Sequence, residues 1–522
     1  MESALTNNKK SLLSGLFLQF PVLLVALSGV LYFLGSFALS FTNANPLNKP
    51  QFVGLDNYAK VFSTGYRIVV NNSITYMLVV FIFCIGTITA ALFISKLKTI
   101  FGILGGALLS VFSFSAIFPS FVRVMFSGDS YGYINSVFMS LGLLKEPVAW
   151  FEKFGSSIYL VFAVAAITAP IFIITYIFAK NGKKTLGVMT AVCAMPILFA
   201  GTSGISISLL GYPAPNYADW FPLVIRDGYQ VCYELGKTSA LWVVAAAMFF
   251  VWCALCCGII FLMSKALKRI KLPQVLTKIV GYVLFAATVL KTILFVLPNV
   301  TYVVNGSFKP VDELVLFPPS IFVKRPTFSN YTTILGEQLF SSLSDVWIIL
   351  LFCVITIIPS AIGFALLKNP KVKKWLSFLF VPCLAFMPFC IGFPSSVAIR
   401  LGSFFTSVGA VAVFLVTYYL TKSVTEAHKY KAIKIISGAF CVITTVFCMG
   451  MANINFDVTI PNQINWLITN RLWATNGVAR AGVAFAGDVL LGLFTIASVL
   501  VPIVLFMVSY FIGKSKKVKG NK

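Results

Sequence analysis

The stretch that decides the fold is SFKPVDELVLFPPSIFVKRPTFSNY, residues 307–331, which is polar, proline-rich and aromatic and lies between two long apolar runs. An earlier stretch, QFVGLDNYAKVF at residues 51–62, has the same place in the hydropathy pattern. Each stretch follows one apolar run, contains an Asn-Tyr pair and leads into the next run. The pairs begin at Asn57 and Asn330, so they are 273 residues apart, about half of the 522 residues. This offset predicts two copies of one unit joined head to tail.

The composition is typical of a membrane protein. Hydrophobic residues make up 59% of the chain and charged residues 11%, whereas soluble proteins carry about a quarter charged residues. Twelve apolar runs are long enough to cross about 30 Å of hydrocarbon, and their continuous rather than alternating pattern favours helices over a barrel. We therefore expect an all-α polytopic protein of about 12 transmembrane helices. The runs lie at about 15–42, 72–95, 99–126, 156–179, 185–211, 239–264, 279–300, 345–367, 375–399, 403–420, 435–453 and 486–512.

The net charge of +25 follows the topology that these runs predict. If the N-terminus is cytoplasmic and every run crosses, the inner segments hold 25 of the 40 Lys and Arg residues and only two acids, Glu2 and Glu426. This asymmetry satisfies the positive-inside rule at all seven inner segments. It places both termini in the cytoplasm and argues against nucleic-acid binding, whereas contact with anionic lipid headgroups is compatible with it.

The chain divides into two predicted halves, residues 1–270 and 271–522. Six helices return the chain to the side where it began, and the basic segment 265–278 joins the halves without a flexible Gly/Ser linker. A parallel repeat, related by an axis along the membrane normal, is the natural arrangement for such halves. The first apolar run is too long for a signal-peptide core, and we expect it to be a retained helix.

No constellation of catalytic residues is apparent in the sequence. A glycine-rich phosphate-binding loop with lysine is absent, which argues against an ATPase within the chain. Ten of the eleven cysteines fall in or at the edges of apolar runs. The group Cys253, Cys256 and Cys257 could be a metal site, but no His or carboxylate lies nearby in sequence, which favours small packing residues. We expect no enzyme, no metal and no cofactor in this chain.

Both halves contain short motifs at matched places in the hydropathy pattern. The motifs of the first half are FVGLDNY (52–58), YGYIN (131–135) with LGL (141–143) and Trp150, and LGKTSAL (235–241). Those of the second half are SFKP (307–310) with Glu313-Leu314, Pro318-Pro319, PTFSNY (326–331), and the ending VP (501–502), LF (505–506) and KG (519–520). These motifs resemble the membrane permeases of binding-protein-dependent sugar ABC importers, those of the first half one permease partner and those of the second half the other. The resemblance implies two six-helix permeases, usually separate chains, fused in a type I importer fold.

One feature departs from this family. Its permeases carry a cytoplasmic loop with an E-A-A…G motif, which forms a coupling helix seated in the ATPase. The equivalent loop of the first half is the five-residue turn 180–184, which cannot hold such a helix. The second-half loop, 421–434, has Glu426-Ala427 without the following glycine. Coupling would then use another inner segment, such as 265–278 with Lys268 and Arg269, or the protein no longer pumps.

Candidate pathway residues are charged or aromatic. Arg123 and Lys291 lie at or inside apolar runs, where charge is costly and often functional, although Arg123 could snorkel and Lys291 could form a buried pair. Aromatic residues in two predicted outer loops could stack on sugar rings or form an interfacial belt. These are Trp220, Tyr229, Trp466 and Trp473.

The resemblance predicts the transmembrane permease subunit of an ABC importer for a carbohydrate or similar polar solute. It implies cytoplasmic ATPase subunits, which would bind the ATP, and an extracytoplasmic solute-binding lipoprotein as partners, in a bacterial plasma membrane. The alternative is a permease-derived scaffold or complex subunit that no longer couples to an ATPase. A membrane enzyme acting on lipid-linked substrates is a third reading, disfavoured by the lack of a polar catalytic cluster.

Overall fold

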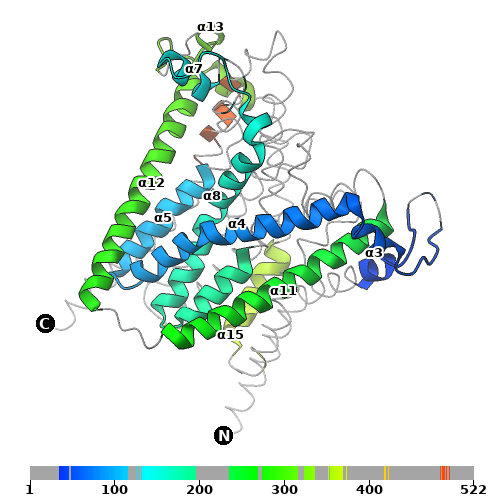
Figure 1. Cartoon of the computed structure of the whole chain (residues 1–522). Coiled ribbons are helices and arrows are strands. Elements are labelled where there is room, and N and C mark those ends of the chain that lie inside the picture. Colours follow the sequence, from blue (N-terminus) through cyan, green and yellow to red (C-terminus); the bar gives the residue numbers. More distant parts are fainter. Residues whose placement is uncertain are drawn as a thin grey trace, which may run out of the picture. The chain divides into compact units, whose positions relative to one another are not determined.

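We describe the protein from a computed structural model of the whole chain (Figure 1). The structure describes residues 34–115 except 46 and 48, 132–195, 234–267, 273–314, 322–335 and 353–367, together with residues 126, 128, 130, 351, 372, 417, 418, 421, 482, 483, 485–487, 489, 490 and 493.

Helices dominate these residues, and no strand occurs within the described ranges; an isolated bridge pairs Thr42 with Phe52. This agrees with the all-α fold that the continuous apolar runs predict. The elements are α3 (Asp56–Val61), α4 (Thr64–Ile94), α5 (Thr99–Ser115), α7 (Tyr133–Ser140), α8 (Trp150–Lys180), α11 (Leu235–Leu267), α12 (Gln274–Phe308), α13 (Val311–Leu314), the π-helical stretch η2 (Cys353–Ile357) and α15 (Ile358–Leu366).

Three described helices are long and apolar enough to cross a membrane. They contain the segments Arg67–Ile94, Leu235–Lys265 and Gln274–Leu294. Each begins several residues before the apolar run that predicts it, because polar first turns continue the helix beyond the hydrophobic stretch. The protein is therefore a helical membrane protein, whereas the total of twelve spans stays a prediction.

The chain forms two compact units. One comprises Leu39–Phe340 and Phe456–Leu493, and the other comprises Met1–Ala38, Ser341–Asn455 and Phe494–Lys522. Most described residues belong to the first unit, and η2 and α15 belong to the second. These units group residues by contact, whereas the predicted boundary at residue 270 separates two copies of a repeat, and that boundary stays a prediction.

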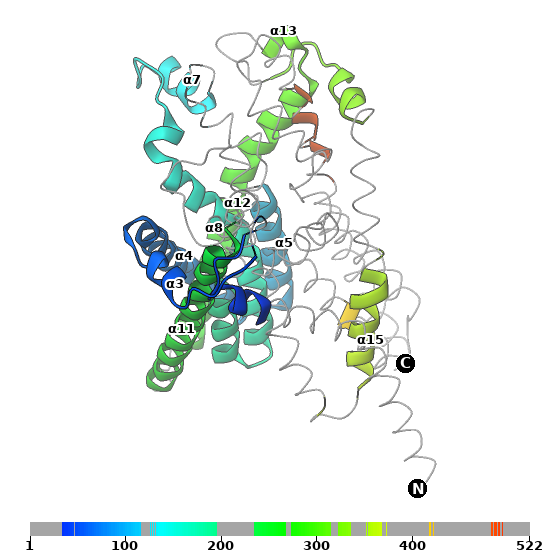
Figure 2. The ribbon, with the colours of Figure 1, turned by 90° about the vertical axis from the view of Figure 1, so that its right-hand side faces the viewer.

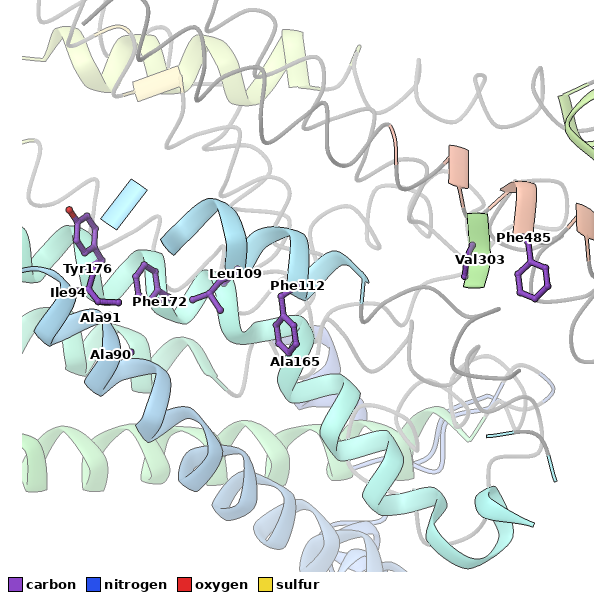
Figure 3. Close-up of a cluster of buried hydrophobic side chains, with 11 residues drawn as sticks. Ala90, Ala91, Ile94, Leu109, Phe112, Ala165, Phe172, Tyr176, Val303 and Phe485 are labelled. Atoms are coloured by element: carbon purple, nitrogen blue, oxygen red, sulfur yellow. The ribbon is translucent and has the colours of Figure 1, made fainter. Parts of the chain in front are cut away.

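The core of the larger unit is formed where α4, α5, α8 and α12 meet. Helix α8 packs against α4 and α5, and α12 packs against the same two helices. Figure 3 shows the buried side chains at this junction, with Phe112 of α5 beside Ala165 of α8, and Val303 of α12 beside Phe485. The remaining members of the cluster are Ala90, Ala91, Ile94, Leu109, Ala169, Phe172 and Tyr176.

Small residues allow α5 and α8 to approach closely. A Cβ on Gly102 would lie 1.9 Å from the Tyr176 ring, and one on Gly105 would lie 3.3 Å from the Phe172 ring. The Phe172 and Tyr176 rings are stacked, with centroids 5.9 Å apart and an interplanar angle of 4°. Glycine on one helix facing aromatic rings on another is the close packing expected in lipid, where van der Waals contact drives helix association.

Two glycines end helices in the left-handed conformation. Gly142 follows α7 with φ of 72°, and Gly182 follows α8 with φ of 79°. After each glycine, the next backbone N–H donates back to a carbonyl five residues earlier: Leu143 to Phe138, and Lys183 to Phe178. This is the Schellman motif, which favours glycine because a Cβ is strained at positive φ. Gly182 thereby makes the turn after α8 tight, and the next helix begins at Lys184.

Proline does not interrupt α8. Pro170 lies inside this 31-residue helix, which is continuous on both sides of it. Pro170 is therefore accommodated within a helix. Pro119, Pro196 and Pro388, which also lie in predicted apolar runs, lie outside the described residues.

Candidate functional site

The two Asn-Tyr pairs that organise the sequence each hold together a small polar cluster. In the first cluster, the Asn57 side-chain amide donates hydrogen bonds to the backbone carbonyls of Ser40 (2.9 Å) and Thr42 (2.7 Å). The Tyr58 hydroxyl shares a hydrogen bond of 2.7 Å with the Ser40 hydroxyl, and its ring contacts Phe41. We call these five residues the first clamp.

The second cluster has the same pattern. Asn330 donates to the carbonyls of Ser307 (2.9 Å) and Lys309 (3.0 Å), and the Tyr331 and Ser307 hydroxyls are 2.7 Å apart. Burial raises the pKa of the Tyr331 hydroxyl, and its hydrogen bond with Ser307 opposes that shift. We call Ser307, Phe308, Lys309, Asn330 and Tyr331 the second clamp.

The clamps also agree in their ring and backbone contacts. The Phe41 and Tyr58 centroids are 5.6 Å apart with the rings tilted by 49°, and those of Phe308 and Tyr331 are 5.2 Å apart and tilted by 44°. In each clamp, the phenylalanine carbonyl accepts a 2.8 Å hydrogen bond from a backbone N–H just before the Asn-Tyr pair. The donor is Val53 in the first clamp and Thr327 in the second.

Burial makes these hydrogen bonds structurally important. Ser40 and Ser307 have no exposed surface, and Asn57 and Asn330 are 4% and 6% exposed. A buried amide or carbonyl without a partner costs about 1–3 kcal/mol. Loss of the hydrogen bonds that the Asn amides donate would therefore destabilise each clamp. Each clamp ties the end of one apolar segment to the polar stretch that leads into the next. The clamps are thus the structural counterpart of the repeated sequence pattern.

A glycine packs directly against each clamp. A Cβ on Gly236, in the first turn of α11, would lie 1.9 Å from the Thr42 carbonyl oxygen. The Gly236 backbone N–H also donates to the Ala44 carbonyl (3.2 Å). A Cβ on Gly482 would lie 2.5 Å from the Asn330 amide nitrogen. Helix α11 and the short α3 lie side by side as a result (Figure 2). Each clamp therefore also contacts the segment that leads into the last predicted helix of its half.

The second clamp is longer by six residues, since Ser307 and Asn330 are 23 positions apart and Ser40 and Asn57 are 17. The extra chain folds around Glu313, which is 2% exposed. Its carboxylate accepts hydrogen bonds from the backbone N–H groups of Lys324 (3.0 Å) and Arg325 (2.7 Å). Burial lowers the pKa of the nearby Lys309 ammonium, and the Glu313 charge opposes that shift.

Another quoted motif forms a second polar anchor in the first half. The buried Asn135 accepts hydrogen bonds from the Val148 N–H (3.1 Å) and the Trp150 indole (2.8 Å), and donates to the Val148 carbonyl (3.0 Å). The YGYIN and Trp150 elements are therefore in contact. The last three residues of YGYIN begin α7 (Tyr133–Ser140).

Lys291 is the one pathway candidate that lies within the described residues. It is exposed on α12, and its ammonium nitrogen lies 4.2 Å from the centroid of the Phe112 ring on α5. Such cation–π contacts contribute about 0.5–1 kcal/mol in water and about 2 kcal/mol where the groups are desolvated. The contact joins two packed helices, and a role for Lys291 in a pathway stays a prediction.

The other predicted site residues lie outside the described residues. They are the pathway candidates Arg123, Trp220, Tyr229, Trp466 and Trp473, and the ATPase-contact candidates Lys268, Arg269, Glu426 and Ala427.

The structure also brings together residues that the sequence pattern did not connect. The Cys193 and Cys257 sulfurs are 3.4 Å apart, which joins the helix Lys184–Met195 to α11. Among the described residues, no cluster of His, Cys, Asp or Glu is suited to hold a metal ion. Sequence spacing grouped Cys253, Cys256 and Cys257 because they share one helix, but a partner 64 residues away leaves no local signal.

No family model matches the chain, and no curated protein or solved structure matches it.

Proposed function

We propose that the chain is the membrane-spanning subunit of an ABC importer that moves a carbohydrate or similar polar solute. The observation that carries this proposal is the pair of clamps, because the same five contacts recur in two segments half a chain apart. Equivalent contacts at equivalent places in a hydropathy pattern support a duplicated membrane unit. Duplicated halves related by a membrane-normal axis are a common design of transporters.

In this proposal the clamps hold neighbouring helices of each half together at their predicted outer ends. Each one fixes the polar segment before the second helix of its half against the first, and Gly236 and Gly482 seat the last helix on the same cluster. Alternating access moves one helical bundle against another around a central site. Clamps of this kind would let each half move as one body while the solute passes between them.

The resemblance supplies the partners of the proposed complex. Cytoplasmic ATPase subunits would hydrolyse ATP, and an extracytoplasmic binding lipoprotein would deliver the solute to the plasma membrane. Lys268, Arg269, Glu426 and Ala427 are the proposed contacts with the ATPase. No catalytic role is assigned to the chain itself.

A second candidate function rests on the turn after α8. Only residues 181–183 separate α8 from the helix that begins at Lys184. So short a turn leaves no room for the coupling helix that the family places in this loop. This observation favours a permease-derived scaffold or complex subunit that anchors other proteins and does not pump.

Purification of the complex separates the two candidates. The tagged full chain would be extracted from its native membrane in mild detergent, and co-purifying proteins would be identified by mass spectrometry. The importer predicts an ATPase and an extracytoplasmic binding protein, and ATP hydrolysis that increases when the binding protein and its solute are added. Recovery of other membrane or surface proteins without an ATPase would overturn the importer and favour the scaffold.

A pair of matched variants tests the coupling segment. Lys268→Gln with Arg269→Gln should weaken retention of the ATPase if segment 265–278 replaces the missing coupling helix. Lys9→Gln with Lys10→Gln removes the same charge from the predicted inner tail and should leave retention unchanged. Equal retention by both double variants would exclude this segment from coupling.

A further inference from the structure

The lysines at one end of the helical core form a cluster that neither the clamps nor the proposed transport function uses. Two helical connections contribute to it. The turn between α4 and α5 carries Lys96 and Lys98, and the turn after α8 carries Lys183 and Lys184, with Lys180 at the end of α8. All five side chains are exposed.

Tertiary contacts hold these two connections together. The Lys180 ammonium donates to the carbonyls of Ser95 (3.3 Å) and Leu97 (2.7 Å), so α8 ends against the α4–α5 turn. The first turns of α12 adjoin the same place, because a Cβ on Gly281 would lie 3.1 Å from the Phe93 carbonyl oxygen. This brings in Lys278, which is one helical turn before Gly281 and is also exposed.

Two of these lysines interact. The pKa of Lys184 is lowered mainly by its interaction with the Lys96 side chain, and partial desolvation adds to the shift. The segments that form the cluster, residues 95–98, 180–184 and 274–281, contain no Asp or Glu to balance the charge. Like charges held close together repel each other, and an anion between them would relieve the repulsion.

The position of the lysine cluster relative to the membrane indicates which anion could bind there. The apolar span of α4 ends at Ile94, two residues before Lys96, and Lys278 lies in the first turns of the α12 span, which begins at Gln274. Residues in the terminal turns of spanning helices and just beyond them lie at the level of the lipid headgroups. Phosphate groups of anionic phospholipids are concentrated there and attract adjacent lysines.

We propose that Lys96 and Lys184, with Lys98, Lys183 and Lys278 around them, form a binding site for the phosphate headgroup of an anionic phospholipid. Lys180 is excluded from the direct contact because its ammonium is engaged by the backbone carbonyls of the α4–α5 turn. A bound headgroup would bridge the two turns and strengthen the packing of α8 against α4.

Native mass spectrometry of the full-length protein tests the site. Detergent-solubilised protein would be titrated with phosphatidylglycerol, with phosphatidylcholine, and with inorganic phosphate. We expect phosphatidylglycerol to bind most tightly. Each lysine near a headgroup contributes about fivefold in affinity, so Lys96→Gln with Lys184→Gln should weaken phosphatidylglycerol binding about 30-fold.

Matched variants exclude general charge effects and misfolding. Lys60→Gln with Lys145→Gln removes the same charge at a distance in sequence from the cluster and should keep wild-type binding. Lys96→Arg with Lys184→Arg keeps the charge and should also bind, which shows that the site tolerates substitution. Loss of binding in the Arg variant as well as the Gln variant would overturn the proposal.

Three further results would overturn it. Equal binding of phosphatidylcholine would remove the role of the negative charge. Equally tight binding of inorganic phosphate would show that the lysines bind free anions and do not select a lipid. Unchanged phosphatidylglycerol binding in the Gln variant would show that these lysines do not bind the lipid, and would favour an acidic protein as the partner of the cluster.

Discussion

Replacing Asn57 by Asp tests whether the clamps hold the structure as separate, equivalent units. The substitution keeps the side-chain size but exchanges the amide group, which donates to the Ser40 and Thr42 carbonyls, for a carboxylate oxygen. Two hydrogen bonds are lost, each contributing about 1 kcal/mol, and two buried carbonyls lose a donor. We expect the first clamp to open more readily by about 2–3 kcal/mol, a factor of about 30 to 150 in its closed-to-open ratio.

Hydrogen–deuterium exchange with mass spectrometry measures this opening locally. In Asn57→Asp, peptides from residues 39–62 should exchange faster by that factor, while peptides from 307–335 should exchange at the wild-type rate. Asn330→Asp should give the reverse pattern, and the double variant should show both effects, because distant sites without shared partners act additively. Acidic pH should partly restore protection, since a protonated Asp regains one donor.

Asn181→Asp provides the matched control. Asn181 is exposed at the end of α8 and the same chemical change there should leave exchange in both clamps unaltered. Acceleration in both clamps by either single variant would refute the reasoning, because it would mean that the clamps open together. A wild-type exchange rate in Asn57→Asp would show that the hydrogen bonds donated by the Asn57 side chain do not hold residues 39–62 in place.

Three other substitutions or treatments test the packing and charge of the larger unit. Gly236→Ala should destabilise the protein by about 1–3 kcal/mol in thermal unfolding, because its Cβ would meet the Thr42 carbonyl, whereas Gly258→Ala on the same helix meets nothing within 4 Å and should be neutral or stabilise by about 0.5–1 kcal/mol. A mild oxidant should join Cys193 to Cys257, whose sulfurs are 3.4 Å apart, with loss of two hydrogens detected in a cross-linked peptide; Cys193→Ser should abolish the product and Cys84→Ser should not. Lys96→Gln should raise the pKa of Lys184, measured by NMR of labelled lysine side chains, because it removes the ammonium that lowers that pKa. In the wild type, the folded protein releases the Lys184 proton at lower pH than the unfolded chain, so stability should rise with pH on approach to 10.5, and an unchanged pKa in Lys96→Gln would contradict the contact.

Much of the helical fold can be predicted from the sequence. A long run of apolar residues with at most one charge can satisfy its backbone in lipid chiefly as a helix, so composition alone predicts α4, α11 and α12. The Gly142 and Gly182 turns are likewise local, since positive φ favours glycine whatever surrounds it. The ends of the helices are less predictable, because polar residues continue each helix beyond its apolar stretch.

The candidate site is only partly visible in the sequence. The Asn57 and Asn330 positions stand out by their repeat, but the sequence does not say which carbonyls the amides bind. The 17-residue and 23-residue separations between clamp partners show why, since the connecting segments differ in length and the contacts are nevertheless the same. The six extra residues lie in the segment between Lys309 and Asn330, which contains Glu313.

The sequence by itself determined that this is a helical membrane protein with a repeated polar stretch, because hydropathy acts on each segment independently of the others. Only the tertiary structure decided that the repeated stretches form equivalent clamps, that Cys193 meets Cys257, and that Lys180 bonds to carbonyls of the α4–α5 turn. These contacts join segments that are distant in the chain. Their energies depend on the distance between atoms in space, and no local pattern of residue types encodes that distance.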